Sequence, residues 1–302
     1  MIEEFGGDFL QWLRGFYFVA KKESVTLAGL EMGRNQPTIS HQIKCLENEF
    51  GVTLFDRSRG KMKLTPEGKV FLDKAISVFE TIKEMKSEIG EDSKLYQGGV
   101  DIAATHAIIR YFLPQFIVHF TKKWPKVNFK LEGGGLKMIL GRIDSAEADF
   151  GIANLNSVPD GVVYYDLIET GLKLIAPKNN PFSFDFEPTL EQISKIPFIF
   201  FPSSSTITPL VERRFAEDNL KLNVVLVLNN FESVKKYVEL GVGVSILDDY
   251  TITRKDVEKL DIYALDRFFS PRKYGIIIRR QKYLSPVAKA FLRCIKPDLQ
   301  FK

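Results

Sequence analysis

Residues 24–64 decide the fold and read SVTLAGLEMGRNQPTISHQIKCLENEFGVTLFDRSRGKMKL. Ser24 and Asn35 are favourable N-cap residues because their side chains accept hydrogen bonds from the free N–H groups of a first helical turn. Gly33 and Gly51 are favourable helix ends because glycine adopts the left-handed conformation at little cost. The stretch therefore predicts two helices joined by a turn of about three residues and followed by a basic segment.

The second predicted helix has an apolar and a polar face. Ile39, Ile43 and Leu46 recur at helical spacing and should point inward. The outer face carries no acid before Glu47, and glutamine, serine, threonine and lysine suit base edges and phosphates. This geometry is that of a helix-turn-helix, with an ordinary surface hairpin of two helices as the alternative. The candidate DNA-binding residues here are Arg34, Gln36, Pro37, Thr38, Ser40, His41 and Lys44.

A basic segment follows the second helix. Arg57, Arg59, Lys61 and Lys63 surround Gly60 without an intervening acid. A basic hairpin beside a recognition helix is positioned to meet phosphates. We therefore predict a wing and add Arg57, Arg59 and Lys61 to the candidate DNA-binding residues.

A long helix should begin after the wing. Thr65 is a good N-cap, and Pro66 is tolerated in a first helical turn. Apolar residues then recur at alternating spacings of four and three, as in a heptad stripe. We expect this stripe to pair with a second copy and form a dimer, whereas the alternative is packing on its own domain. The stripe consists of Phe71, Ala75, Val78, Ile82, Met85 and Ile89.

Composition and charge limit the class of protein. The chain has 302 residues, 45% of them hydrophobic and 26% charged, which is typical of a soluble protein with two or three domains. The net charge of +4 is only a weak argument for nucleic acid, and the two cysteines suit a reducing compartment. No apolar run approaches the roughly 20 residues of a membrane span, and acids stand where a signal peptide needs cations. We expect a cytoplasmic protein without a membrane partner.

The second half of the chain alternates between strands and helices. This order predicts α/β lobes, the first with a mostly parallel sheet. In the first lobe we expect strands at 100–105, 127–132 and 149–153 and helices at 111–123 and 136–145. In the second we expect strands at 172–177, 198–201, 223–228 and 244–247 and helices from about 208 and 232. A strand from Tyr274 and a helix to Cys294 should return to the first lobe.

Polar and small residues cluster where several of these strands end. Hydroxyls and N–H groups at facing helix N-termini make an anion site, so we expect a small anionic effector in a cleft between the lobes. The alternatives are ordinary capping by serine and threonine and a structural role for His106. The candidate effector-binding residues are Thr105, His106, Gly133, Gly134, Ser204, Ser205, Thr206 and Phe231.

Both halves resemble LysR-type transcriptional regulators. The N-terminal half matches their signature at Phe16, Val19, Ser24, Ala28, Asn35, Gln36, Pro37, Thr38, Ile39, Ser40, Ile43, Leu46, Glu47, Gly51, Leu54, Phe55, Asp56, Arg57, Leu64, Thr65, Pro66, Glu67 and Gly68. The second half matches at Leu113, Pro114, Phe120, Pro125, Val127, at residues 148–153, at Val238 and at residues 241–246. One departure is Gly29, where the family usually has alanine and where we expect a slightly looser helix.

The resemblance implies a division of the chain. It implies a winged helix-turn-helix in residues 1–65, a linker helix for dimerisation in 66–95, and an effector-binding domain in 96–302. The lobes of that domain would be 96–168 with 269–302, and 169–268, as in type 2 periplasmic binding proteins. The implied partners are double-stranded promoter DNA, a small-molecule effector, a second copy in a dimer or tetramer, and RNA polymerase.

The effector half is also similar to the cysteine-biosynthesis regulators of this family. The similarity lies at residues 104–106, 110–111 and 113–114, and it implies an effector role for Thr105 and Thr206. That branch has polar residues where this chain has Ala107 and Ile108, so the identity of the effector is not carried over.

Other classes find less support in the sequence. Three histidines and two cysteines show no metal-ligand spacing, and we find no nucleophile elbow or phosphate-binding loop, so we predict neither an enzyme nor a cofactor. A secreted solute-binding protein would not carry a helix-turn-helix. A thiol-disulfide sensor needs two cysteines in the effector domain, where only Cys294 lies, and Cys45 is better explained by packing.

Overall fold

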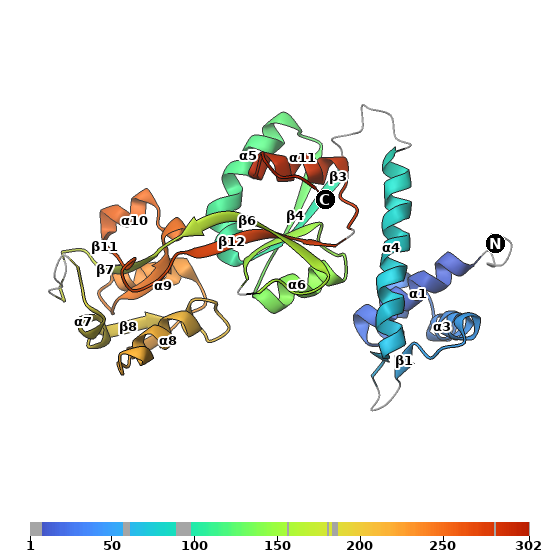
Figure 1. The fold of residues 1–302 in the computed structure, drawn as a ribbon, viewed down its shortest axis with the longest axis horizontal. Helices are drawn as coiled ribbons and strands as arrows, with labels where there is room; N and C mark the ends of the chain where they lie inside the picture. Colours follow the sequence, from blue (N-terminus) through green and yellow to red (C-terminus); the bar gives the residue numbers. More distant parts are fainter. Residues whose placement is uncertain are drawn as a thin grey trace. The chain divides into compact units, whose positions relative to one another are not determined.

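The computed structural model describes residues 8–56, 61–88, 98–155, 157–179, 181–182, 187–280 and 282–301. The chain divides into two compact units, drawn in Figure 1. The first comprises Met1–Leu95 with Gln281–Ser285, and the second comprises Tyr96–Arg280 with Pro286–Lys302. Within the described ranges, no helix combines the length and the apolar character needed to cross a membrane.

The first unit is a helical domain with a small hairpin. Its elements are α1 (Phe9–Lys22), α2 (Val25–Met32), α3 (Gln36–Phe50), β1 (Phe55–Asp56), β2 (Lys63–Leu64) and α4 (Pro66–Glu88). The predicted caps are confirmed, since Ser24 and Asn35 accept backbone hydrogen bonds of 3.3 and 2.9 Å. Gly33 and Gly51 end α2 and α3 with φ of 62° and 64°. Local residue choice therefore determines where both helices begin and end.

Gly29 has a different role from the one we expected. A Cβ atom at this position would lie 2.7 Å from the carbonyl oxygen of Arg34, in the turn that follows α2. The Arg34 N–H donates a 2.8 Å hydrogen bond back to the Gly29 carbonyl. Glycine thus allows the turn to close tightly against α2, rather than merely loosening the helix.

The first turns of α4 belong to the core of the first unit. The Phe71 ring centroid lies 5.0 Å from those of both Phe16 and Phe50, and Ala75 is 2% exposed. The expectation that Ala75 pairs with a second copy was wrong, because it is buried within its own unit, and Phe71 is half-buried against the same core. Because α1 lies against the N-terminal part of α4, the unit's own helices cover this part of the stripe.

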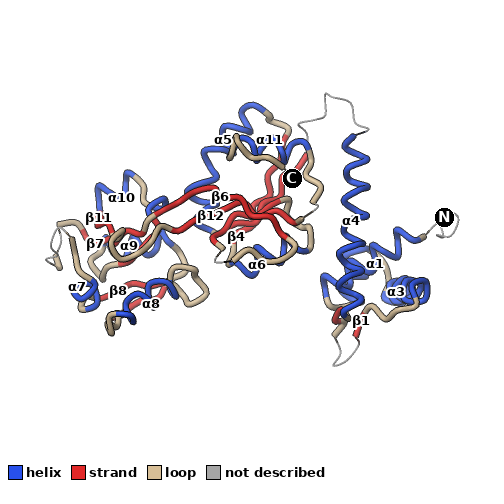
Figure 2. Tube along the Cα trace, in the orientation of Figure 1, coloured by secondary structure: helices blue, strands red, loops and turns tan. Residues whose placement is uncertain are grey.

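Lobe 1 of the second unit is a five-stranded sheet covered on both faces. Its elements are β3 (Gly98–Ala104), η3 (Ile108–Phe112), α5 (Leu113–Lys123), β4 (Val127–Gly133), α6 (Leu136–Asp144), β5 (Phe150–Asn154), β6 (Val162–Thr170), β12 (Arg272–Arg279) and α11 (Pro286–Ile295). Figures 1 and 2 show α5 and α11 on one face of the sheet and α6 on the other. The strand order is β4-β3-β5-β12-β6.

Strand direction in this sheet follows the prediction for β3, β4 and β5 and reverses only at the returning strand β12. Only β3 pairs in parallel, with β4 and β5, whereas β12 runs antiparallel to both β5 and β6. The sheet is therefore mostly parallel, as predicted: β4, β3, β5 and β6 run in one direction, and β12 runs against them. The sequence reading missed β6, in which Asp166 and Glu169 interrupt the apolar residues.

Lobe 2 contains two smaller sheets. Its elements are β7 (Leu172–Pro177), α7 (Leu190–Ser194), β8 (Pro197–Phe200), α8 (Thr208–Glu217), β9 (Asn223–Val227), α9 (Phe231–Glu239), β10 (Ser245–Asp248), η4 (Asp249–Thr251), α10 (Arg254–Lys259) and β11 (Leu260–Ala264). Strands β10-β7-β11 are antiparallel, and β8-β9 are parallel. We had not predicted α7, α10 or β11. The chain crosses between the lobes twice, from β6 into β7 and from β11 into β12.

Candidate functional site

Helix α3 presents a polar face to solvent. Its inner residues Ile39, Ile43 and Leu46 are no more than 1% exposed. The predicted DNA-binding residues on its other side, and Arg34 in the preceding turn, are all accessible. Arg34, Gln36, Pro37, Thr38, His41 and Lys44 are exposed, and Ser40 is half-buried. A two-faced helix of this kind can enter a groove of DNA while its apolar side stays fixed to the protein.

Two local contacts modify this face. The Thr38 hydroxyl donates a 2.6 Å hydrogen bond to the Asn35 side chain, so its oxygen remains to accept one. The Cys45 Sγ atom lies 3.5 Å from His41 Nδ1, one helical turn away. His41 thus has a neighbour within its own helix, and its ring stays exposed.

The predicted wing forms a two-stranded antiparallel hairpin. Phe55 of β1 pairs with Leu64 of β2, and Lys61 is exposed. Glu47 of α3 accepts hydrogen bonds from the backbone N–H groups of Leu54, at 2.9 Å, and Phe55, at 3.4 Å. This contact, which the sequence reading missed, fastens the recognition helix to the hairpin. The predicted contacts Arg57 and Arg59 lie outside the described residues.

The distal part of α4 keeps apolar residues at the surface. Val78 and Met85 are 39% and 53% exposed, and Ile82 is half-buried. Ile89, the last member of the predicted stripe, lies outside the described residues. This part of the helix, unlike Phe71 and Ala75, has apolar surface available to a second copy.

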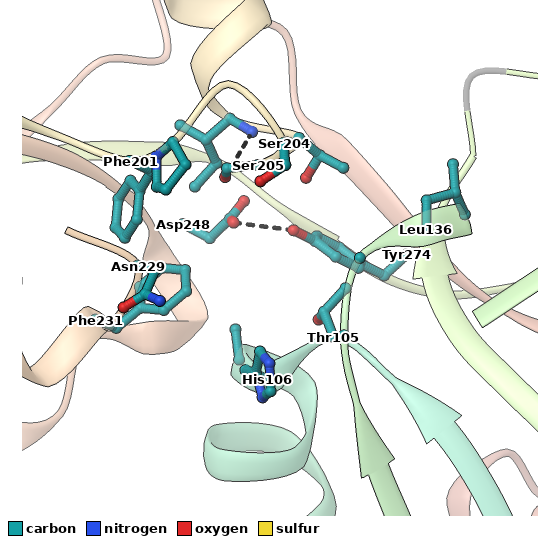
Figure 3. Close-up of a pocket in the computed structure, with 16 residues that line it drawn as sticks. Thr105, His106, Leu136, Phe201, Ser204, Ser205, Asn229, Phe231, Asp248 and Tyr274 are labelled. Carbon is teal, nitrogen blue, oxygen red and sulfur yellow. Dashed lines mark hydrogen bonds between the residues drawn. The ribbon is translucent and has the colours of Figure 1, made fainter. Parts of the chain in front are cut away.

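A cavity of about 290 Å³ lies between the lobes of the second unit. Its volume is near the lower end of the range for small-molecule sites. Figure 3 shows residues of lobe 1 and lobe 2 on opposite sides of it. The lining residues are Thr105, His106, Ala107, Gly134, Gly135, Leu136, Phe201, Pro202, Ser204, Ser205, Thr206, Ile207, Asn229, Phe231, Asp248 and Tyr274.

The lobe 1 wall consists of the ends of β3 and β4. The Thr105 hydroxyl accepts a 3.4 Å hydrogen bond from the Ile108 N–H, so it caps a helix and lines the cavity at once. Gly133 does not line the cavity. A Cβ atom there would lie only 2.4 Å from Nδ1 of His106, so glycine leaves room for the imidazole, while Gly134 forms the wall.

The lobe 2 wall carries the predicted hydroxyls. Ser205 Oγ accepts a 3.4 Å hydrogen bond from the Ile207 N–H. The Thr206 hydroxyl accepts a 2.6 Å hydrogen bond from Arg272, which lies on β12. The Arg272 guanidinium therefore fixes the Thr206 hydroxyl, which lines the cavity. The sequence did not predict this contact.

A buried ion pair contributes to the cavity wall through its carboxylate. Nη1 of Arg272 lies 2.6 and 2.7 Å from the two carboxylate oxygens of Asp248, and the Tyr274 hydroxyl donates to Asp248 at 2.9 Å. The Asp248 and Arg272 side chains are 1% and 5% exposed. Burial raises the pKa of the Asp248 carboxyl, and the charge and hydrogen bonds of Arg272 oppose that rise. Arg272 therefore compensates the one carboxylate in the cavity lining.

Helix starts surround the cavity. The lining includes the residues at the beginning of the helix that starts at His106 and of α6, α8 and α9. Free N–H groups and the positive end of the helix dipole favour negative charge at such positions. With Asp248 compensated, this arrangement favours an anion over a cation. Among the described residues, no group of three or more His, Cys, Asp or Glu side chains is arranged to hold a metal ion.

Sequence reasoning missed Asn229, Asp248 and Tyr274 in the cavity lining. Asn229 follows a predicted strand, and this position was a signal for a site residue at a strand end. Asp248 likewise follows the strand predicted at 244–247, whereas Tyr274 begins a predicted strand and gave no such signal. The pairing register between β12 and β6 shifts between Tyr274 and Gly275, and such irregularities re-aim side chains.

Comparison with known proteins agrees with both halves of this description. Residues 10–69 match the family described as bacterial regulatory helix-turn-helix protein, lysR family, and residues 93–300 match the LysR substrate binding domain. The chain is 28% identical over 278 residues to the HTH-type transcriptional activator CmpR of Synechocystis sp., covering 92% of this chain and 91% of CmpR. It is 25% identical over 291 residues to the regulator CysB of Burkholderia cenocepacia, and the match covers 94% of this chain and 91% of CysB.

Solved structures show the same architecture. A full-length OxyR variant from Pseudomonas aeruginosa covers 95% of this chain and 93% of its own, with a TM-score of 0.72 and 19% identity. The cofactor-binding domain of the Cbl transcriptional regulator covers 68% of this chain and 90% of its own, with a TM-score of 0.62 and 26% identity. The chain belongs to the LysR family of transcriptional regulators, with a DNA-binding helix-turn-helix and an effector-binding domain.

Proposed function

We propose that α3 reads base edges in the major groove of promoter DNA while Lys61 contacts phosphate. The exposed polar side of α3, opposite a fully buried apolar side, carries this proposal. Gln36 lies in the first turn of α3, and glutamine can make two hydrogen bonds to adenine. Lys61 lies next to the hairpin, and a lysine there supplies sequence-independent attraction.

Two substitutions separate these roles. Gln36→Ala should cost about 1–3 kcal/mol on the preferred promoter sequence and little on unrelated DNA. Lys61→Ala should weaken binding to all sequences and reduce the slope of affinity against salt by about one. Fluorescence anisotropy with specific and unrelated duplexes at several salt concentrations measures both effects.

Lys137→Ala is the matched control, because Lys137 is also an exposed lysine but lies on α6 of the second unit. This variant should bind DNA like the unchanged protein. Equal losses for Gln36→Ala and Lys61→Ala on every duplex would overturn the assignment of base and phosphate contacts.

We propose, further, that the effector is a small anion bound in the cavity between the lobes. The convergence of four helix starts on a cavity of about 290 Å³ supports this proposal. Thr105 lies at one of these helix starts and Ser205 at another, so hydroxyls from both lobes would reach the same ligand. A ligand held by both lobes favours the arrangement in which they are close.

A thermal-shift screen tests the class of effector. Sulfate, thiosulfate, acetylserines and small organic acids should include a compound that raises the melting temperature of the full-length protein above that in sodium chloride of equal ionic strength. Thr105→Val should reduce that shift.

Thr189→Val is the control, since the Thr189 hydroxyl caps α7 by accepting a 3.2 Å hydrogen bond from the Gln192 N–H and does not line the cavity. A ligand-induced shift that is equal in both threonine variants would remove Thr105 from the site.

We also propose that the protein works as a dimer, joined through the distal part of α4, and that two dimers combine into a tetramer on promoter DNA. The exposed Val78 and Met85 support the dimer. We propose RNA polymerase as a further partner beside promoter DNA, and a cytoplasmic location, where both partners are found.

A further inference from the structure

A cluster of polar side chains joins the two lobes beside the cavity. Tyr111, from η3 of lobe 1, donates a hydrogen bond to the carboxylate of Glu232 on α9 of lobe 2. Its hydroxyl oxygen also accepts a 3.3 Å hydrogen bond from Nζ of Lys235. Arg110, the residue before Tyr111, places its Nε atom 3.3 Å from Glu232. Two neighbouring residues of lobe 1 thus meet two charged residues of one helix in lobe 2.

Lobe 2 holds its half of this cluster in place by itself. Lys235 is 5% exposed, and its Nζ atom donates hydrogen bonds to the Thr251 carbonyl, at 2.5 Å, and to Asp256, at 2.7 Å. Lys235 therefore presents a donor and Glu232 presents an acceptor at neighbouring positions. A phenol hydroxyl donates and accepts at the same time, so tyrosine complements both groups.

The protonation states favour this arrangement. Burial alone would raise the pKa of Glu232, but the Tyr111 hydrogen bond and the charges of Lys235 and Arg110 lower it overall. Burial and the neighbouring Glu232 carboxylate raise the pKa of Tyr111. The carboxylate is thus charged and the phenol neutral around neutral pH, which is the combination that the hydrogen bond requires.

The backbone of lobe 1 is irregular where it carries Tyr111. Residues Ile108–Phe112 form a turn of π-helix, closed by a hydrogen bond from the Leu113 N–H to the Ile108 carbonyl. A π-turn inserts one extra residue into a helix and commonly occurs at functional positions. The extra residue rotates the side chains of this turn relative to those of a regular α-helix. In this conformation, Arg110 and Tyr111 both contact Glu232.

Phe231 connects the cluster to the cavity. It lines the cavity and directly precedes Glu232 at the start of α9. Its ring centroid lies 6.3 Å from that of Tyr111 and 4.7 Å from that of Phe201, a second lining residue. Figure 3 shows Phe231 and Phe201 on the same side of the cavity. A ligand that moves Phe231 therefore also moves Glu232, the next residue along α9.

We infer that Tyr111, Glu232 and Lys235 form an interlobe latch that restrains opening of the cleft and is coupled to the cavity through Phe231. This inference deepens the proposed function and rests on it, because it takes the cleft as the place where the effector enters. The latch itself acts without a ligand, so it can be tested in the ligand-free protein.

Amide hydrogen exchange of the full-length protein, without added anion, tests the latch. Tyr111→Phe removes only the hydroxyl and keeps the ring against Phe231. Exchange in residues 106–112 and 231–236, which meet across the cleft, should become faster on the order of tenfold. Exchange in β5 and β10, inside the two lobes, should stay unchanged. Unchanged exchange at the cleft would overturn the latch.

Two further variants sharpen the test. Tyr237→Phe makes the same chemical change at an exposed position of α9, and it should leave exchange at the cleft unaltered. Glu232→Ala should speed exchange at least as much as Tyr111→Phe, because it also removes the Arg110 contact. The double variant should show less than the combined effect of the two single variants, because both remove the hydrogen bond between Tyr111 and Glu232. Additive effects in the double variant would show that the two residues act separately and would overturn the latch.

Failure of the latch and failure of the anion proposal are distinguishable. The latch depends on exchange measured without anion, whereas the anion proposal depends on the melting temperature in sulfate and the other anions. Faster exchange in Tyr111→Phe supports the latch even if no anion stabilises the protein. Stabilisation by sulfate with unchanged exchange supports the anion proposal and rejects the latch.

Discussion

At the scale of single residues, Arg272 links the crossing strand β12 to the cavity of the effector-binding domain. It compensates the buried Asp248 and donates a 2.6 Å hydrogen bond to Thr206, a lining residue. Removing one partner of a buried ion pair leaves an uncompensated charge, which is more costly than losing a pair at the surface. The position of Thr206 in the cavity wall therefore depends on Arg272.

Arg272→Met should lower the free energy of unfolding of this domain by about 3–5 kcal/mol. Arg213→Met is the control, since Arg213 pairs with Glu217 at the surface and its side chain is 73% exposed, and it should cost no more than about 1 kcal/mol. Urea denaturation followed by circular dichroism measures both values. Equal losses would contradict the role assigned to the buried pair.

The loss of unfolding free energy caused by Arg272→Met should also depend on pH. Burial already raises the pKa of Asp248, and without Arg272 nothing of equal strength opposes that rise. A folded-state pKa above the unfolded value means that the protonated group favours folding at low pH, and that this contribution disappears as pH rises. The deficit of the variant should therefore be larger at pH 7 than at pH 5, and a deficit independent of pH would contradict this explanation.

At the scale of elements, α4 divides into a part that folds the first unit and a part that remains available. Phe71 and Ala75 lie among the unit's own aromatic residues, whereas Val78 and Met85 are exposed. The same heptad spacing therefore has two roles along one helix, and two substitutions can separate them.

Phe71→Ala should lower the free energy of unfolding of the first unit by about 3 kcal/mol, because it leaves a cavity among aromatic rings. Met85→Asp should leave this stability nearly unchanged and weaken self-association, because it puts a charge into the apolar surface. Denaturation measures the first effect and sedimentation velocity the second. Unaltered sedimentation of Met85→Asp would remove the distal part of α4 from the dimer interface.

At the scale of the whole molecule, one chain combines a DNA-binding helix-turn-helix with an effector-binding domain. An effector can change DNA binding only if it favours one arrangement of the protein over another. Such coupling is reciprocal, since each ligand changes the affinity for the other by the same factor.

We expect the stabilising anion to change the affinity for promoter DNA by a factor of about 5 to 150, and promoter DNA to change the affinity for the anion by the same factor. Anisotropy with and without anion gives the first factor, and calorimetry with and without DNA gives the second. Thr105→Val should reduce the effect of the anion on DNA binding. An anion that binds the cavity without changing DNA affinity would contradict the proposed regulation.

The sequence by itself determined the local features of this protein. Ser24 and Asn35 fixed helix starts, Gly33 and Gly51 fixed helix ends, and the spacing of apolar residues identified the buried face of α3. These features depend on residues within one or two turns of each other, so short stretches of sequence contain the information. Most strands and helices of the lobes were predicted for the same reason.

Only the tertiary structure decided which distant groups meet. Tyr111 and Glu232 are 121 residues apart, and Arg272 and Asp248 are 24 apart. The antiparallel direction of β12 and the packing of Phe71 against Phe16 also depend on contacts between separate elements. No local spacing encodes these contacts, because each arises when two surfaces fit together in the folded chain.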